Sequence, residues 1–492
     1  MSYLLAHDLG TSGNKACLYT NKGELIKAET VGYETYYLGG GKIEQNPEDW
    51  WKAIVESTRK LIEGIDVSEI KGISFSAQMM GLVCIDRDGR VLRNSMIHSD
   101  QRASEESRET QKQISEKDFF AITGHHSGPS YPMQKLMWVK KHEPEIYEKT
   151  YKVLNAKDYI VFRMTGKIAT DYTDASSTNM FDVPARKWSE KLCRMGGIDM
   201  EKLPEVKDST WVAGTLIPEV AAEMGLAPET KVVLGAGDGM CSSVGCGAIV
   251  PGKVYNYIGS SSWITGIFEK PPIGEKMYLE IWAHPAGPWA NAGGTMQSAG
   301  SAFEWAADTL YGSVASPDIE KELAQTKPGS GGVIFLPYLN GERVPFWNEK
   351  ARGTFVGISN LTTRADLLRA VLEGVAFNLK MILDETETWM DVKEITVLGG
   401  TIRNKLFCQI LADVYGIPVV TLKNTSQITS LGAAIIAGVG CGEIDSFEST
   451  EGFCTVDRRY YPEKETAEYY AGRSGLLRET YESLVNVFEK LN

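Results

Sequence analysis

Eight residues near the N-terminus bring together the groups needed to hold a phosphate. The segment is Asp8-Leu-Gly-Thr-Ser-Gly-Asn-Lys15. Gly10 and Gly13 let the backbone come close to a ligand, and Thr11 and Ser12 can donate hydrogen bonds to phosphate oxygens. The lysine adds a positive charge, and Asp8 could hold Mg²⁺ through water. A polar hairpin turn has the same composition, so both interpretations stay open.

A second turn of small residues lies near the middle of the chain. Gly259-Ser-Ser-Ser262 stands between two apolar segments and repeats the first pattern without its acid and its lysine. The amides and hydroxyls of Gly259, Ser260 and Ser261 suit a second phosphate contact. An ordinary turn would use the same residues.

A carboxylate follows an apolar segment in Gly235-Ala-Gly-Asp-Gly239. A dinucleotide fingerprint would need glycine at the next position, which is Met240. The flanking glycines let a ligand approach, so Asp238 could accept a hydroxyl proton as a general base. The alternative is that Asp238 caps a helix over 240–247.

A third glycine turn is Leu398-Gly-Gly-Thr-Ile-Arg-Asn404, between an expected strand and an expected helix. Gly399 and Gly400 permit close approach to a flat ring or a ribose, and Asn404 could donate to that ligand. Asn404 could equally be the N-cap of the helix.

Two further segments offer side chains to a small polar ligand. In Gln78-Met-Met-Gly81, Gln78 could bind a hydroxyl while Met79 and Met80 form a flexible wall. In His98-Ser-Asp-Gln-Arg102, Asp100 and the arginine could point into a cleft. The alternatives are a methionine pair in the core and an exposed ion pair.

Other catalytic signatures do not compete with these turns. The sequence has no H-E-x-x-H, no G-x-S-x-G and no C-x-x-C pair among its 8 cysteines. We expect reduced, mostly buried thiols and a cytoplasmic protein. The N-terminus lacks the basic region and cleavage site of a signal peptide, and no segment reaches the ~20 apolar residues that span a bilayer.

The elements that must carry these turns are short strands and covering helices. A helix is expected to begin at Asn46–Pro47, with Trp50 on its apolar face. Strands of the first half are expected at 3–6, 15–19, 24–30, 70–76, 82–86 and 231–234. An antiparallel meander followed by helix and strand alternation predicts a mixed sheet covered by helices.

The second half repeats this order, with strands at 254–258 and 263–268 around the second turn. After it we expect helices at 301–311, 364–387, 405–415 and 429–438, and strands at 333–336, 394–398 and 418–422. A break in the pattern at 248–252 predicts a domain boundary, which gives domains 1–250 and 251–492.

Composition limits the class of protein. The chain has 492 residues, 43% of them hydrophobic, and ~100–200 residues per domain predicts two to four domains. With 64 acidic and 51 basic residues the net charge is -13, so we expect neither nucleic acid nor an anionic membrane as a partner. The sequence leaves a homodimer open.

In their order along the chain, these turns resemble motifs of the FGGY family of carbohydrate kinases, and within that family those of the xylulokinases. The resemblance covers nearly the full length. Further matching motifs are Glu44-Gln-Asn-Pro-Glu-Asp-Trp-Trp51, Ser76-x-Gln-Met-x-Gly81, Thr170-Asp-Tyr-Thr-Asp-Ala-Ser176, Pro337-Tyr-Leu-x-Gly-Glu-Arg-x-Pro345, Arg369-Ala-Val-Leu-Glu-Gly-Val-Ala-Phe377, Gln409-Ile-Leu-Ala-Asp413 and Leu431-Gly-Ala-Ala434.

The resemblance implies an α/β fold of two ribonuclease H-like domains, as in actin-like ATPases, facing a central cleft. It also implies ATP-dependent phosphorylation of a sugar hydroxyl with Mg²⁺. Residues 1–250 would bind the sugar and carry the first phosphate loop and the catalytic Asp238, with Asp8 near the metal. Residues 251–492 would bind ATP. The residues then expected at ATP are Gly10, Thr11, Ser12, Lys15, Gly259, Ser260, Ser261, Gly399, Gly400 and Asn404, and those at the sugar are Gln78, Met79, Met80, Asp100 and Asp238.

Three departures from the family pattern bear on the substrate. Met80 replaces the histidine of Gln-Met-His-Gly, His98 replaces a tryptophan, and Thr401 replaces the third glycine of a Gly-Gly-Gly run. Because a methionine cannot donate to a hydroxyl, the sugar side is remodelled. D-xylulose is the first candidate acceptor, and ribulose, gluconate or a tetritol are alternatives. Glycerol is not favoured, since glycerol kinases carry a different first phosphate loop.

A different class of function also fits the fold that the resemblance implies. An actin-fold ATPase could serve as a nucleotide-switched binding or regulatory protein. Asp8 and Asp238 argue against this alternative, because a binding protein has no need of a catalytic base.

Overall fold

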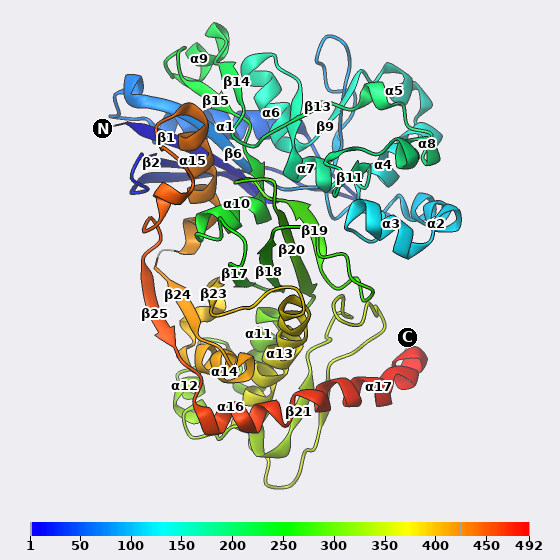
Figure 1. Ribbon diagram of the computed structural model, residues 1–492, viewed down its shortest axis with the longest axis vertical. Helices are drawn as coiled ribbons and strands as arrows, with labels where there is room; N and C mark the ends of the chain where they lie inside the picture. The colour runs from blue at the N-terminus through cyan, green and yellow to red at the C-terminus, as the bar shows by residue number, and fades with distance from the viewer. Residues whose placement is uncertain (1, 424, 492) are drawn as a thin grey trace. The chain divides into compact units, whose positions relative to one another are not determined.

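The computed structural model describes residues 2–423 and 425–491 (Figure 1). The chain forms two compact units: unit 1 is Met1–Val250, Glu269–Asn291 and Ser426–Cys454, and unit 2 is Pro251–Phe268, Ala292–Thr425 and Thr455–Asn492. The chain first changes unit after Val250 and later returns twice to unit 1. The second return, Ser426–Cys454, belongs to unit 1 because α15 (Ile428–Cys441) packs against β1 and β6. Our division into domains 1–250 and 251–492 stays a prediction.

Unit 1 is built on a mixed sheet of order β14-β15-β6-β1-β2-β3. The expected meander β1-β2-β3 is confirmed as antiparallel, and β6 and β15 add to it in parallel. The strands are β1 (Tyr3–Leu9), β2 (Gly13–Thr20), β3 (Leu25–Gly32), β6 (Ile70–Ala77), β14 (Val212–Thr215) and β15 (Lys231–Val233). A short strand, β16 (Ala236–Gly237), also pairs with β6.

Helices cover both faces of this sheet. Successive residues of β1 point to opposite faces, and apolar residues of this strand are buried on each face. Leu5 and Leu9 pack in one cluster with Trp50 of α1 (Pro47–Leu61), and with α6 (Ala156–Thr165) and α9 (Pro218–Met224). Leu4 and Ala6 pack in another cluster with α15 and with α10 (Asp238–Gly245). Asn46 caps α1 and Pro47 is its first residue, as the sequence predicts.

Unit 2 repeats the strand arrangement of unit 1. Its sheet includes the order β18-β17-β23-β24-β25, in which β17-β18 is an antiparallel hairpin and β17, β23 and β24 are parallel. The strands are β17 (Val254–Ile258), β18 (Ser262–Phe268), β23 (Ile395–Leu398), β24 (Val419–Leu422) and β25 (Val456–Tyr460). The duplicated hairpins expected from the sequence are therefore confirmed.

The helices of unit 2 include two that the sequence places to the residue. These are α13 (Arg364–Glu387) and α14 (Lys405–Tyr415). The long helix α13 is buried along most of its length, and its buried Arg369 is paired with Glu373 at 2.7 Å between Nε and Oε1. The other helices are α11 (Gly300–Tyr311), α12 (Asp318–Leu323), α16 (Lys464–Ala471) and α17 (Ser474–Leu491).

The stretch between β6 and β14 contains most of the elements that the sequence analysis does not foresee. Besides α6, its α-helices are α2 (Ser104–Gln113), α3 (Glu116–Thr123), α4 (Pro132–His142), α5 (Pro144–Lys149), α7 (Tyr172–Ser176) and α8 (Glu190–Met195). Its longer strands are β7 (Val83–Ile85), which the sequence analysis expects at 82–86, and the unforeseen β9 (Lys152–Leu154), β10 (Ala169–Asp171) and β13 (Glu205–Lys207). Across the described residues, no helix is both long and apolar enough to cross a bilayer.

Candidate active site

Asp8 and Asp238 lie at the same edge of the unit 1 sheet. Asp8 pairs in register with Ser76 on β6, and Ala236 pairs with the same Ser76 from the other side of that strand. Asp238 follows two residues later, as the first residue of α10. Because β1, β6 and β16 are parallel, their carboxyl ends bring the two carboxylates to neighbouring positions.

Two glycines allow the chain to reach this edge. Gly235 has φ +80°, and a Cβ there would lie 2.2 Å from the carbonyl oxygen of Phe75. A Cβ on Gly237 would lie 2.4 Å from Sδ of Met79. Position 235 therefore requires glycine, because the neighbouring atoms are backbone, while a side chain at Gly237 would have to displace Met79, which packs directly beside the residue that precedes Asp238.

The negative charge of Asp8 influences the ionisation of Asp238. Desolvation by the surrounding protein atoms and the negative charge of Asp8 raise the pKa of Asp238 to about 6. Asp238 nevertheless has an exposed surface that a ligand can reach. Burial also raises the pKa of Asp8, while a hydrogen bond from Ser76 Oγ at 2.9 Å and the positive Lys15 act in the opposite direction. A carboxylate whose pKa is about 6 is a better proton acceptor than an ordinary aspartate and is still ionised at neutral pH.

The Gly10–Ser12 turn is held from one side through its carbonyl groups. Tyr33 donates to the Gly10 carbonyl through its hydroxyl and to the Ser12 carbonyl through its amide. The Thr11 carbonyl accepts from Gln45 Nε2 at 2.6 Å. Within the described residues, the amides and hydroxyls of Thr11 and Ser12 donate to no protein atom, and both side chains are exposed. The turn therefore presents donors to solvent, as an anion site requires.

Lys15 adds a cation beside this turn. It stands opposite Asp8 in the β1-β2 hairpin, and its Nζ donates to the Ser426 carbonyl at 3.2 Å. Ser426 lies just before α15. The ammonium group is thus placed by its own strand and by the segment that leads into α15.

The second small-residue turn in unit 2 is held in the same manner. Its Gly259 carbonyl accepts from the Gly300 amide at 2.9 Å, and its Ser260 carbonyl accepts from the Ala299 and Ser301 amides. A Cβ on Gly300 would lie 2.4 Å from that Gly259 carbonyl. Among the described residues, the amides and hydroxyls of Ser260 and Ser261 donate to no protein atom.

In the Gly399–Asn404 segment the structure shows the cap role of the asparagine, and its contact with a ligand stays a prediction. Gly399 has φ +99°, and a Cβ there would lie 2.2 Å from the Ile258 carbonyl, so only glycine fits. Asn404 caps α14, because its Oδ1 accepts from the Phe407 amide at 3.1 Å. In the described part of the chain Nδ2 of Asn404 has no protein acceptor, so it can still donate to a ligand. Thr401, which stands where the family pattern has a third glycine, donates from Oγ1 to the Ile258 carbonyl at 3.3 Å.

On the expected sugar side, Gln78 and Met79 are buried and Met80 is partly exposed. Met80 has φ +61°, a left-handed conformation that non-glycine residues rarely adopt. Its carbonyl accepts from the buried Lys135 Nζ at 2.8 Å, which also donates to the Ile97 carbonyl at 2.7 Å. Burial lowers the pKa of Lys135 to about 7, against the effect of Asp100. Lys135 therefore fixes the backbone of this loop.

Asp100 is fully buried, and its carboxylate is already occupied. It accepts from the Ile43 amide at 2.7 Å and from the Arg102 guanidinium, whose Nη2 lies 2.7 Å from Oδ2. Arg102 also bonds Glu44 at 2.7 Å. The exposed ion pair weighed in the sequence analysis is wrong, because this pair is buried. Contact between Asp100 and a substrate stays a prediction, and it requires this network to open.

The sequence analysis misses Gln45, although this residue stands in one of the matching motifs. Its Oε1 accepts from the Trp50 indole Nε1 at 2.9 Å and from Gln78 Nε2 at 2.7 Å, while its Nε2 donates to the Thr11 carbonyl. The indole N–H can only donate, so it fixes which end of the Gln45 amide carries oxygen. Gln45 thereby joins Gln78 to the phosphate turn.

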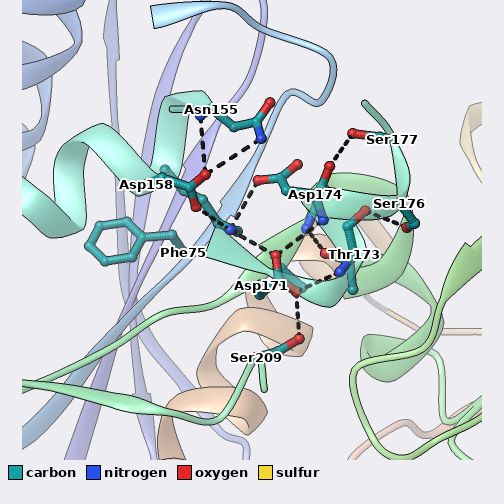
Figure 2. Close-up of polar contacts among 12 residues, drawn as sticks. Phe75, Asn155, Asp158, Asp171, Thr173, Asp174, Ser176, Ser177 and Ser209 are labelled. Carbon is teal, nitrogen blue, oxygen red and sulfur yellow. Dashed lines mark hydrogen bonds and ion pairs between the residues drawn. The ribbon is translucent and has the colours of Figure 1, made fainter. Parts of the chain in front are cut away.

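The sequence analysis also misses a buried cation beneath the site. Lys157 Nζ lies 2.7 Å from Asp158, 2.8 Å from Asp171 and 3.0 Å from Asp174. Figure 2 shows these three carboxylates turned toward one amino group. Burial opposes the charge on Lys157, but the carboxylates raise its pKa well above the usual value. Asp171 and Asp174 belong to the matching Thr170–Ser176 motif, which is the one signal that the sequence offered.

The residues at this edge fit a magnesium ion that is shared with phosphates. In the described residues no three His, Cys, Asp or Glu side chains form a cluster that holds a metal by protein ligands alone. Mg²⁺ bound with a nucleotide needs only one or two carboxylates, because phosphates and water supply the other ligands. Asp8 can supply one of them, directly or through water.

The two family models that match the chain describe the N-terminal and C-terminal domains of the FGGY family of carbohydrate kinases. The N-terminal model covers residues 3–245 and the C-terminal model covers residues 280–441. The chain belongs to the FGGY family of carbohydrate kinases. The family expected from the motifs is thus confirmed.

Known proteins that are named for two different substrates, xylulose and gluconate, resemble this chain over almost its full length. It is 31% identical to a xylulose kinase of Bacillus subtilis, over 98% of this chain and 97% of that protein. It is 30% identical to a gluconokinase of the same organism, over 95% of this chain and 93% of that protein.

Solved structures show the same fold. The crystal structure of a ligand-bound xylulose kinase from Lactobacillus acidophilus matches with a TM-score of 0.94 at 29% identity, over 100% of both chains. A gluconate kinase from the same organism matches with a TM-score of 0.94 at 28% identity, over 100% of both chains. The expected two-part α/β architecture of this kinase family is therefore confirmed.

Proposed function

We propose that this FGGY kinase transfers the γ-phosphoryl group of ATP to a hydroxyl of a ketopentose or related sugar or polyol, with D-xylulose as the first candidate. Gluconate is the main alternative, since relatives of similar identity are named for it. Ribulose and a tetritol remain further candidates. The observation that carries the proposal is the carboxylate pair Asp8 and Asp238 at one sheet edge, beside a turn whose donors face solvent.

Asp238 is the proposed general base. Its raised pKa of about 6 lets it take the hydroxyl proton as the bond from sugar oxygen to phosphorus forms. It cannot remove that proton beforehand, because an alcohol is a far weaker acid. Asp238 therefore acts mainly on the rate of transfer, and less on binding.

Phosphoryl transfer demands charge stabilisation and in-line positioning more than covalent chemistry. In our proposal, the donors of Thr11, Ser12, Ser260 and Ser261 bind phosphate oxygens, and Lys15 adds positive charge. Gly399, Gly400 and Asn404 take the nucleoside, with Nδ2 of Asn404 as the donor. Residues 1–250 would then carry the acceptor and 251–492 most of the nucleotide contacts.

Asp8 is the proposed partner of the magnesium ion, directly or through water. When bound, Mg²⁺ would neutralise charge on the phosphates. Burial raises the pKa of Asp8, while the hydrogen bond from Ser76 and the charge of Lys15 act in the opposite direction and favour its ionised form. A cytoplasmic location and a homodimer stay predictions from the sequence.

The test is an ADP-release assay on a panel of ketoses, polyols and gluconate, with ³¹P NMR of the products. We expect one acceptor to stimulate ADP release and to appear as a phosphate ester. ATP hydrolysis that is independent of every sugar, with no phosphorylated product, would contradict the proposed transfer to a sugar hydroxyl. It would favour the nucleotide-switched binding protein instead.

A further inference from the structure

One carboxylate oxygen binds two separate segments of the chain that lead to Asp238. Oδ2 of Asp171 accepts from the Ser209 hydroxyl at 2.7 Å and from the Thr173 amide at 3.0 Å. Figure 2 shows Ser209 and Thr173 reaching this carboxylate from different segments of the chain. Asp171, Thr173 and Ser209 are all buried.

Both anchored residues in turn hold the strand that leads to Asp238. The Ser209 carbonyl accepts from the Gly235 amide at 2.9 Å. The Thr173 hydroxyl accepts from the Gly237 amide at 2.9 Å. These two hydrogen bonds therefore hold the chain at Gly235, just before β16, and at Gly237, its last residue.

The anchor is itself fixed by charge. Its other oxygen, Oδ1, lies 2.8 Å from Lys157 Nζ and accepts from the Asp174 amide at 3.2 Å. Lys157 is fully buried and also pairs with Asp158 and Asp174. A buried cation that is shared among three carboxylates cannot leave without exposing unpaired charges, so Asp171 has no freedom to turn.

We propose that Asp171, through Thr173 and Ser209, is a positioning residue that sets the place of the Asp238 carboxylate. This inference rests on the proposed role of Asp238 as base. Asp171 touches neither substrate in this arrangement. Its effect is on the geometry of proton and phosphoryl transfer, where a displacement of about 1 Å can cost on the order of 10²-fold in rate.

Thr173→Val tests the proposal most cleanly, because valine keeps the shape of threonine and removes only the acceptor for the Gly237 amide. Thr173→Ser restores that acceptor. The matched control is Thr178→Val in the same segment, whose hydroxyl also accepts a backbone amide, that of Met180 at 3.1 Å, without any link to β16. The assay is steady-state kinetics on the acceptor that the panel identifies, with Tm measured for each variant.

We expect Thr173→Val to lower kcat by about 10- to 100-fold, while KM for ATP and for the acceptor stays unchanged. Thr173→Ser should recover most of the lost kcat. Thr178→Val should keep kcat, although both valine variants lose similar Tm. Equal kcat in the two valine variants, or no recovery with serine, would overturn the proposal.

A second variant covers the case in which Thr173→Val does not fold. Ser209→Ala removes the hydroxyl but leaves the carbonyl that accepts from Gly235, and we expect it to lower kcat in the same direction with KM unchanged. Wild-type kcat in Ser209→Ala would then overturn the inference. Full turnover in Asp238→Asn would instead refute the base itself, so failure of the inference and failure of the proposed function are distinguishable.

Discussion

Gln45 donates from Nε2 to the carbonyl oxygen of Thr11 across 2.6 Å. The same side chain accepts from Gln78 on the expected sugar side. A single buried amide thus links the loop proposed for the acceptor to the turn proposed for the phosphates.

Gln45→Glu separates the two halves of this link. A carboxylate still accepts from Trp50 and Gln78, but it cannot donate to Thr11. Because the loss of one hydrogen bond and a new repulsion from a carbonyl are worth about 1–2 kcal/mol, we expect KM for ATP to rise about 5- to 30-fold. Gln113→Glu, on an exposed helix end, is the control for added charge. An unchanged KM for ATP would show that the turn does not depend on Gln45.

Asp238 should destabilise the folded protein at neutral pH. Its folded pKa of about 6 lies above the unfolded value of about 3.9, so the folded state binds more protons between these values. Stability from this group is therefore present below about pH 4 and is lost as pH rises through 6. We expect Asp238→Asn to have a higher Tm than the wild type at pH 8, with the difference vanishing near pH 4. A lower Tm for Asp238→Asn at pH 8 would contradict the raised pKa.

The same group sets the expected pH dependence of the reaction. The base must be ionised, so kcat/KM should fall tenfold per pH unit below about pH 6. The check is a pH profile of kcat/KM for the acceptor. An acidic limb that falls only below pH 4.5 would show that Asp238 titrates as an ordinary aspartate.

Met80 is expected to set acceptor preference. Its side chain is the partly exposed one of the loop, and histidine at this position could donate to a sugar hydroxyl where methionine cannot. We expect Met80→His to raise kcat/KM for D-xylulose relative to gluconate, measured across the acceptor panel. An unchanged ratio for every acceptor would remove Met80 from substrate choice.

Close packing of α10 against α15 should make one glycine essential for stability. A Cβ on Gly432 would lie 1.9 Å from the Cys241 carbonyl oxygen. We expect Gly432→Ala to lower the free energy of unfolding by about 1–3 kcal/mol in urea, because backbones must move apart. Gly475→Ala, which has open space around its Cβ, should leave stability nearly unchanged. Equal stability in both variants would contradict the tight contact.

Local signals were sufficient to predict many elements of the fold. Asn46 and Pro47 mark the start of α1, and apolar periodicity gives α13 and α14 to the residue. The glycine turns were found because their composition is unusual. The division into units was harder, since the return of α15 to unit 1 depends on long-range packing that no local pattern encodes.

The parts of the site that could not be predicted depend on distant partners. The interpretation of Asp100 as an exposed pair failed because Glu44 and the Ile43 amide, which bury it, lie far away in sequence. Lys157 stands in an ordinary helical segment, and only folding brings Asp171 and Asp174 to it. For Asn404 the sequence left both a helix cap and a ligand contact open; the structure shows the cap through Oδ1, and donation from Nδ2 to a ligand stays a prediction.

The most direct test of the whole account is the turnover number of Asp238→Asn with the acceptor selected from the panel. Formation of the phosphate ester is followed by ³¹P NMR, and ATP binding by calorimetry. We predict that kcat falls by ~10²–10⁴-fold while ATP binding persists, since the base acts on the transfer step. A turnover number equal to that of the wild type would contradict the account.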